Sequence, residues 1–103
     1  MSNKYKRAVC TDGYSVSIQA HNGAYCEPRC DDADLYTEVE LGYPNRPDDL
    51  IIKYAEDPEK PCETVYAYVP VDEVTLLLTK HGGMVEGEVP NGVHVYDRDF
   101  SKK

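Results

Sequence analysis

The chain has 103 residues, enough for one domain with a modest core, and its 19 acidic and 11 basic side chains give a formal net charge of −8. Every acid lies within residues 12–99, where six bases leave a net charge of −13. Such a field repels phosphate backbones, which argues against direct nucleic-acid binding and favours a basic protein partner, although acidic surface also simply keeps a small domain in solution. No apolar run approaches the roughly 18 residues of a membrane span, so we expect no membrane association, a cytoplasmic location and reduced cysteines.

The first half of the chain has the pattern of a sheet. The Asp-Gly pair at residues 12–13 is typical of a tight hairpin turn, because both residues tolerate positive φ, and it predicts paired strands at residues 7–10 and 14–20. Residues 21–34 contain glycine, proline and several aspartates, and they predict a long irregular loop of the kind that often carries function. Apolar and polar residues alternate again in residues 35–41, which predicts a third strand.

The second half of the chain predicts two further strands and a helix. Residues 50–54, LIIKY, have the composition of a short apolar strand, and residues 64–70 alternate between tyrosine and smaller apolar residues. Residues 71–81 have acids in the first turn, apolar residues on one face and cations in the last turn, with glycine beyond the end, which predicts an α-helix. A last short strand is predicted at residues 93–96.

Together these elements predict an α+β fold, in which an antiparallel sheet of four to six strands packs against one helix in the C-terminal half, at about residues 71–81. The helix must belong to the core, since its apolar face would otherwise be exposed. We expect residues 1–103 to form a single domain, with residues 1–6 and 98–103 frayed at its ends.

The stretch AYCEPRC, residues 24–30, has two chemical interpretations. Cys26 and Cys30 have a spacing compatible with half of a zinc site, but the other cysteines and the histidines are scattered singly, so no metal is expected. A catalytic thiol at Cys26 would gain from Arg29, yet the neighbouring acids disfavour a thiolate and no nucleophile signature is present. No phosphate-binding glycine loop or hydrolase motif occurs. The sequence therefore predicts a protein that is not an enzyme and uses no cofactor.

Almost all aromatic residues of the chain are tyrosines, since there are nine tyrosines, one phenylalanine and no tryptophan. Many of them fall on or beside predicted strands, where β propensity and partial burial are a sufficient explanation. The alternative is that these amphipathic rings contact a protein or stack on a base. On that interpretation Tyr66 and Tyr68, which face opposite to the valines and alanine of residues 65–69, are candidate binding residues.

Two further groups are candidates for a ligand or partner site. In the loop, Tyr25 lies near Arg29, the only base of that loop, which must either pair with a neighbouring acid or contact a partner. At the end of the helix, Lys80 and His81 complement the helix dipole, which accounts for them structurally. The functional alternative is that these two residues and Arg29 bind an anionic group in an otherwise acidic protein.

The pieces DGYSVSIQA, YCEPR, ELGYP, YVPVDEV and KHGG, within residues 10–84, resemble a set of short, uncharacterised proteins encoded by tailed bacteriophages. The resemblance implies expression inside an infected bacterium, where small acidic proteins often act on host enzymes or on host defence systems. It assigns no functional residues.

Three functions are compatible with these features. The leading hypothesis is a non-catalytic phage-type binding protein that inhibits a host factor, such as a defence nuclease or another nucleic-acid-binding enzyme, through its acidic, tyrosine-bearing surface. The alternative is a sponge that sequesters a nucleotide signal of host defence, with Tyr25 on the base and Arg29, Lys80 and His81 on phosphate. The third is a virion assembly protein, which would form a homo-oligomer.

Overall fold

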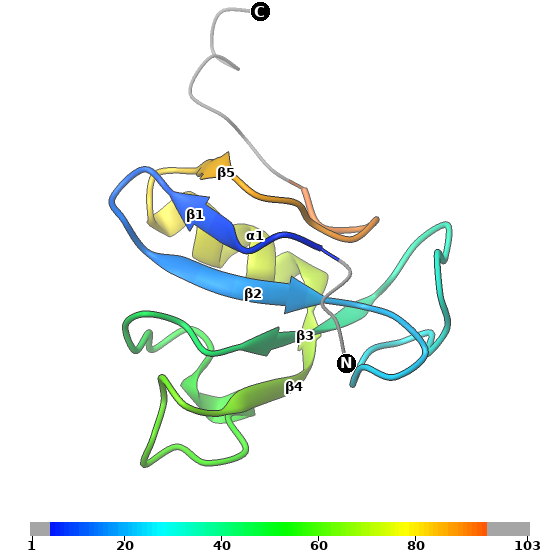
Figure 1. The fold of residues 1–103 in the computed structure, drawn as a ribbon, viewed down its shortest axis with the longest axis horizontal. Coiled ribbons are helices and arrows are strands. Elements are labelled where there is room, and N and C mark those ends of the chain that lie inside the picture. The colour runs from blue at the N-terminus through cyan, green and yellow to red at the C-terminus, as the bar shows by residue number, and fades with distance from the viewer. Residues whose placement is uncertain (1–4, 95–103) are drawn as a thin grey trace, which may run out of the picture.

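The computed structural model describes residues 5–94, which form five strands, one α-helix and one short 3-10 helix. The strands pair antiparallel in the order β4-β3-β2-β1-β5 (Figure 1). This arrangement confirms the predicted α+β fold. In chain order the elements are β1 (Ala8–Cys10), β2 (Ser15–Gln19), β3 (Glu38–Gly42), η1 (Ile52–Tyr54), β4 (Val65–Pro70), α1 (Val71–Lys80) and β5 (Met84–Glu86).

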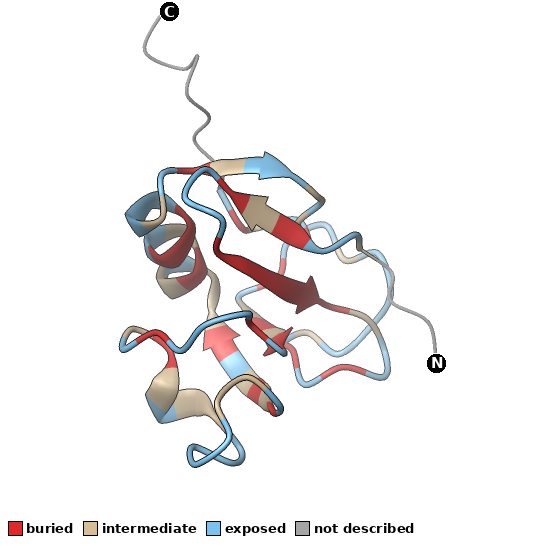
Figure 2. Cartoon of the chain, turned by 60° about the vertical axis from the view of Figure 1, so that its left-hand side comes forward, coloured by how far each residue is buried: buried red, intermediate tan, exposed pale blue. Residues whose placement is uncertain are grey.

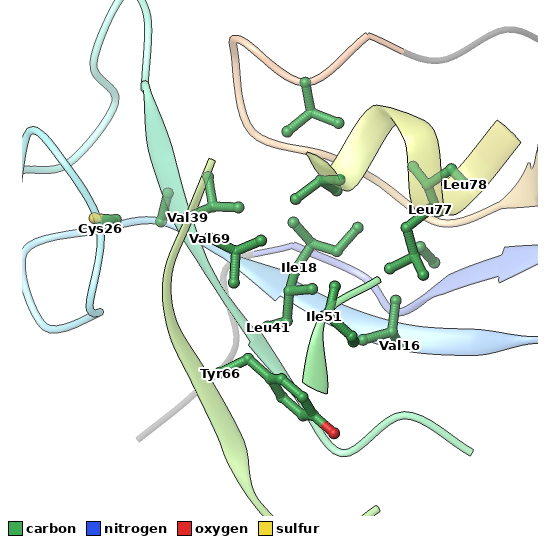
Figure 3. Close-up of a cluster of buried hydrophobic side chains, with 14 of the residues drawn as sticks. Val16, Ile18, Cys26, Val39, Leu41, Ile51, Tyr66, Val69, Leu77 and Leu78 are labelled. Atoms are coloured by element: carbon green, nitrogen blue, oxygen red, sulfur yellow. The ribbon is translucent and has the colours of Figure 1, made fainter. Parts of the chain in front are cut away.

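The core lies between α1 and one face of the sheet (Figure 2). Because side chains of a strand alternate between faces, every second residue of β2 and β3 points toward the helix. Val74, Leu77 and Leu78 form the buried stripe of α1 and complete this core. Figure 3 shows Leu77 and Leu78 on the helix side, with Ile51, which directly precedes η1, and the sheet residues Val16, Ile18, Val39, Leu41, Tyr66 and Val69.

The β1–β2 hairpin forms as the Asp-Gly pair predicted. Gly13 adopts a φ of 94°, and the Asp12 carboxylate accepts a hydrogen bond of 2.9 Å from the backbone N–H of Tyr14. The N–H of Cys10 donates to the Tyr14 carbonyl at 2.8 Å and closes the turn. The predicted helix is also confirmed, and it ends one residue early, at Lys80.

The strand predicted at residues 50–54 is wrong, because this segment forms turns that lead into η1. The Asp48 carboxylate accepts the Leu50 N–H at 2.9 Å, and the Asp48 carbonyl accepts the Ile51 N–H at 3.2 Å. The Tyr54 N–H then donates to the Ile51 carbonyl at 2.9 Å. A carboxylate that satisfies local N–H groups favours a tight turn over an extended strand, and composition alone does not reveal it.

The end of the sheet also differs from the prediction. The last strand of the described residues is β5, which pairs with β1. Of the strand predicted at residues 93–96, residues 93 and 94 belong to no strand, and 95 and 96 lie outside the described residues. Gly83 fixes this course, since its N–H donates to the Leu78 carbonyl at 2.8 Å and its carbonyl accepts the Thr11 N–H at 3.0 Å. The chain therefore returns directly from α1 to the hairpin.

The predicted fraying falls mostly on residues 1–4 and 98–103, which lie outside the described residues. Of the two remaining positions, Tyr5 donates its N–H to the Gln19 side chain at 3.1 Å and Lys6 donates its N–H to the Glu88 carboxylate at 3.0 Å. In the described part of the chain, no helix combines the length and apolar character needed to cross a bilayer.

Gly13 and Gly87 both have positive φ, at 94° and 110°, but their surroundings differ. A Cβ at Gly87 would overlap the Arg7 carbonyl oxygen next to β1, whereas a Cβ at Gly13 would have no atom within 4 Å. We expect Gly13→Ala to lower the free energy of unfolding by about 1–2 kcal/mol through backbone strain alone, and Gly87→Ala to lower it clearly further. Urea unfolding measures both values, and equal losses would contradict the packing around Gly87.

Candidate functional site

The loop that contains AYCEPRC is fastened to the sheet. Glu27 donates its N–H to the Glu38 carbonyl at 3.0 Å and accepts the Thr37 N–H at 2.8 Å, so the loop pairs with the start of β3. Ala24 and Cys26 are fully buried and join the core. Between them, the backbone of Tyr25 is held while its side chain points outward. The predicted irregular loop is therefore present, but its central part has a defined conformation.

A β-bulge in β4 lies beside this loop. Val39 pairs with Val69 and Leu41 pairs with Tyr66, so two residues of β4, Ala67 and Tyr68, oppose Glu40 alone. Tyr68 takes a φ of 54°, a left-handed conformation that costs a bulky side chain of order 1–3 kcal/mol and often marks a functional position. The N–H of Tyr68 donates to the Tyr25 carbonyl at 3.1 Å. The bulge thus joins the loop and directs Tyr68 to the surface.

We name Tyr25, Arg29 and Tyr68 the tyrosine platform, because their side chains meet on the surface. The two rings lie 5.9 Å apart between centroids and are tilted by 40°, and the Arg29 guanidinium lies 5.5 Å from the centroid of Tyr25. Tyr25 and Tyr68 are 37% and 42% exposed. Within residues 5–94, Arg29 forms no ion pair with any acid, so the first alternative that the sequence offered, pairing with a neighbouring acid, is not realised.

Tyr66 is not part of this surface. The alternation predicted for residues 65–69 placed Tyr66 and Tyr68 on one face, and it is wrong because the extra residue of the bulge shifts the pattern. Tyr66 and Val69 share the buried face instead. Tyr66 is fully buried and donates its hydroxyl to the Pro61 carbonyl at 2.6 Å, which makes it a core residue with a satisfied polar end.

Lys80 and His81 lie at the end of α1, in a different place from the platform. His81 has Nδ1 2.7 Å from an Asp12 oxygen and Nε2 2.7 Å from an Asp48 oxygen, and Lys80 Nζ lies 3.1 Å from the other Asp48 oxygen. Asp12 precedes β2, whereas Tyr25 and Arg29 follow it, so the two groups lie at opposite ends of this strand. The structure therefore does not unite the four residues that the sequence proposed for an anionic ligand.

The contacts of His81 affect both aspartates. Each ring nitrogen of His81 faces a carboxylate oxygen, a group that accepts hydrogen bonds when ionised. The hydrogen bond from His81, followed by that from the Tyr14 N–H, lowers the pKa of Asp12. Burial acts to raise the pKa of Asp48, but hydrogen bonds from the Leu50 N–H, His81 and Lys80 outweigh it and lower the value. The cations of the helix end are thus neutralised internally.

Tyr14, directly before β2, completes this cluster. Its ring stacks on His81 with centroids 4.0 Å apart and planes within 6°, and the Arg46 guanidinium lies 5.8 Å from the Tyr14 centroid while contacting Asp12 at 3.3 Å. Burial raises the pKa of Tyr14, and its buried hydroxyl has no hydrogen-bond partner within residues 5–94. The ring, which faces a cation, is therefore the part of Tyr14 that stabilises the cluster.

The cysteines of the loop are separated in environment. Cys26 is buried, burial raises the pKa of its thiol, and its Sγ lies 3.3 Å from the His21 carbonyl, while Cys30 is exposed. The Cys26 thiol therefore lacks the electropositive, accessible environment of a nucleophile. In the described range 5–94, no group of three or more histidine, cysteine or acidic side chains is placed to hold a metal ion.

Sequence reasoning missed Glu40, Asp12, Asp48 and Tyr14. The alternation in residues 35–41 predicts only a polar face for Glu40, and its position under the platform depends on the bulge and on the loop. The Asp-Gly turn marked Asp12, but its pairing with a histidine 69 residues later had no local signal.

Comparisons of this chain with protein-family models, with curated protein sequences and with solved structures found no match.

We expect Asp48→Asn to lower the free energy of unfolding by about 2–3 kcal/mol at pH 7, because His81 and Lys80 lose a charged acceptor whose side chain is only 2% exposed. Asp49→Asn, an exposed neighbour, should change it by less than about 0.5 kcal/mol. Since the pKa of folded Asp48 lies below 3.8, its contribution is complete above that pH and is lost as the pH falls through the folded value. Urea unfolding from pH 7 to pH 3 should show the Asp48→Asn difference shrinking, and a constant difference would contradict this assignment.

Proposed function

We propose that this protein is a non-catalytic binding protein that inhibits a partner protein by covering it with the tyrosine platform. The observation that carries this proposal is Tyr68, which accepts an unfavourable φ of 54° and in doing so presents its ring beside Tyr25. A buried position for the ring would have avoided exposure of the aromatic surface. Backbone strain that exposes an aromatic ring, and does not bury it, is expected where a surface contacts a partner.

The composition of the platform supports protein contact. Tyrosine and arginine are enriched among the residues that dominate interface energies, because they bring large apolar area together with polar ends. The platform is also fixed in advance: Tyr25 donates its N–H to Glu40 at 3.3 Å and accepts the N–H of Tyr68 at 3.1 Å. A surface that loses little conformational freedom on association binds more tightly for the same contact area.

The charge of the chain supports a basic partner. The net charge of −13 over residues 12–99 would attract a positively charged surface and accelerate encounter at low salt. Enzymes that bind nucleic acid carry such surfaces, and the resemblance to phage proteins favours a host factor or a host defence enzyme as the partner. The nucleotide alternative has less support, because Lys80 and His81 are already bound to Asp48 and Asp12.

Capture from a bacterial lysate tests the proposal with the full chain immobilised. We expect a specific protein to be retained at low salt, to be released as salt is raised, and to be lost when Tyr25→Ala and Tyr68→Ala are combined. Tyr43→Ala is the matched control, because Tyr43 is 52% exposed, also has a positive φ of 51°, and lies outside the platform.

Purified partner, once identified by mass spectrometry, should lose activity when the wild-type chain is added and keep it when the double variant is added. Capture that is the same for wild type and double variant would contradict the platform. A chain found in abundance in purified virus particles would instead support the virion assembly alternative.

Arg29→Ala should weaken the binding of that partner by about 1.5–3 kcal/mol, because a guanidinium that reaches a partner carboxylate or carbonyl makes a charged hydrogen bond. The melting temperature should hardly change, since Arg29 forms no ion pair within residues 5–94. Lys53→Ala is the control, because Lys53 also lies over a tyrosine ring, that of Tyr54, at 5.5 Å. Titration calorimetry and thermal melting give both values, and unchanged affinity for Arg29→Ala would exclude the arginine from the interface.

A further inference from the structure

Glu40 lies directly beneath the platform. It occupies the middle of β3 on the face that is turned away from the core, between the buried Val39 and Leu41, and opposite the bulge that carries Tyr68. Its Oε1 accepts the N–H of Tyr25 at 3.3 Å. The carboxylate is therefore fixed on the backbone of Tyr25, on the strand that lies opposite Tyr68.

The second carboxylate oxygen of Glu40, Oε2, has no partner among the residues that the structure describes. Within residues 5–94 no hydrogen bond or ion pair reaches Oε2, and this atom is not among the fully buried ones, so it remains accessible from outside. Burial raises the pKa of Glu40, and the Tyr25 N–H, His21 and Arg29 only partly offset it. A half-buried carboxylate of this kind is unfavourable for the isolated protein and gains from an added cation.

We propose that Tyr25, Glu40 and Tyr68 form a cation slot that receives an arginine or lysine side chain of the partner. The carboxylate supplies the charge and a hydrogen-bond acceptor, and the exposed rings supply the negative faces on which an ammonium or guanidinium rests. Arginine is the better occupant, because its planar group can donate to Oε2 while it lies on a ring. This inference rests on the proposed function and specifies the partner chemistry at the same surface.

Arg29 indicates how the rings bind such a group. Its own guanidinium already lies 5.5 Å from the Tyr25 centroid, so this ring is accessible to a planar cation in the free protein. The side of the slot formed by Tyr68 has no such occupant within the described residues, and the incoming cation is assigned there. Arg29 then remains for an acceptor on the partner, such as a carbonyl or a carboxylate.

The probe is the capped tripeptide Gly-Arg-Gly, compared with Gly-citrulline-Gly, in which a neutral urea replaces the guanidinium at nearly the same shape. Amide chemical shifts of the full chain are followed by NMR at low ionic strength and pH 7. We expect the arginine peptide to shift the amides of Tyr25, Glu40 and Tyr68 and to bind about tenfold or more tightly than the citrulline peptide, as one charged hydrogen bond provides.

Glu40→Gln should abolish this preference, whereas Glu38→Gln, two residues earlier on the same face of β3, should keep it. The melting temperature of Glu40→Gln should not fall, since glutamine still accepts the Tyr25 N–H without a charge to desolvate. Equal effects of the two glutamate variants, or shifts spread over the surface, would show only a general attraction to an acidic protein and would overturn the slot.

The two proposals fail in different ways. If the partner is captured through the tyrosines but its affinity is the same for wild type and Glu40→Gln, the cation slot is wrong and the proposed function stands. If the arginine peptide binds through Glu40 but no partner depends on the tyrosines, the slot stands and the proposed function is wrong.

Discussion

His81 holds three distant segments of the chain with one ring. Its two nitrogens contact Asp12 of the hairpin turn and Asp48 of the segment before η1, while its own backbone caps α1 and its face stacks on Tyr14, which directly precedes β2. This set of contacts fixes the end of the helix against the sheet. Because the helix packs on one face of the sheet, that face becomes part of the core. The opposite face, which carries Glu40 and Tyr68, is left at the surface.

The two clusters of charged residues in this protein differ in whether their charges are paired within the chain. Around His81, each cation has a carboxylate, and the buried Asp48 is satisfied by Leu50, Lys80 and His81 together. Buried charges are tolerated when they are paired in this way, and breaking one pair leaves the other charges exposed to the full desolvation cost. At the platform, Glu40 accepts the Tyr25 N–H and Arg29 lies over the Tyr25 ring, and within residues 5–94 no ion pair joins the two, which favours stabilisation of these groups from outside the chain.

The bulge in β4 allows the sheet to expose the platform while the core packing is kept. A bulge adds one residue to β4, so the inward pattern resumes at Val69 while Tyr68 turns outward. The strain of that single residue is supported by the many regular contacts around it, including the N–H to Tyr25. A loop on the neighbouring strand then supplies the second ring. The platform thus combines Tyr68, which is held by the bulge, with Tyr25, which is held by the loop, and the two residues are 43 positions apart in the chain.

The sequence by itself determined the local elements: the Asp-Gly hairpin, the long loop, the helix that is followed by glycine, and the α+β class. Each of these depends on interactions between residues a few positions apart, which composition and periodicity record directly. It also identified Tyr25, Arg29 and Tyr68 as candidates, by residue type alone. Only the tertiary structure decided that Tyr66 is buried, that LIIKY turns into η1, that β5 pairs with β1, and that Lys80 and His81 are bound to aspartates. The physical reason is that a bulge, a cross-chain carboxylate and a strand pairing depend on which distant residue arrives opposite, and a single sequence carries no local signal of that partner.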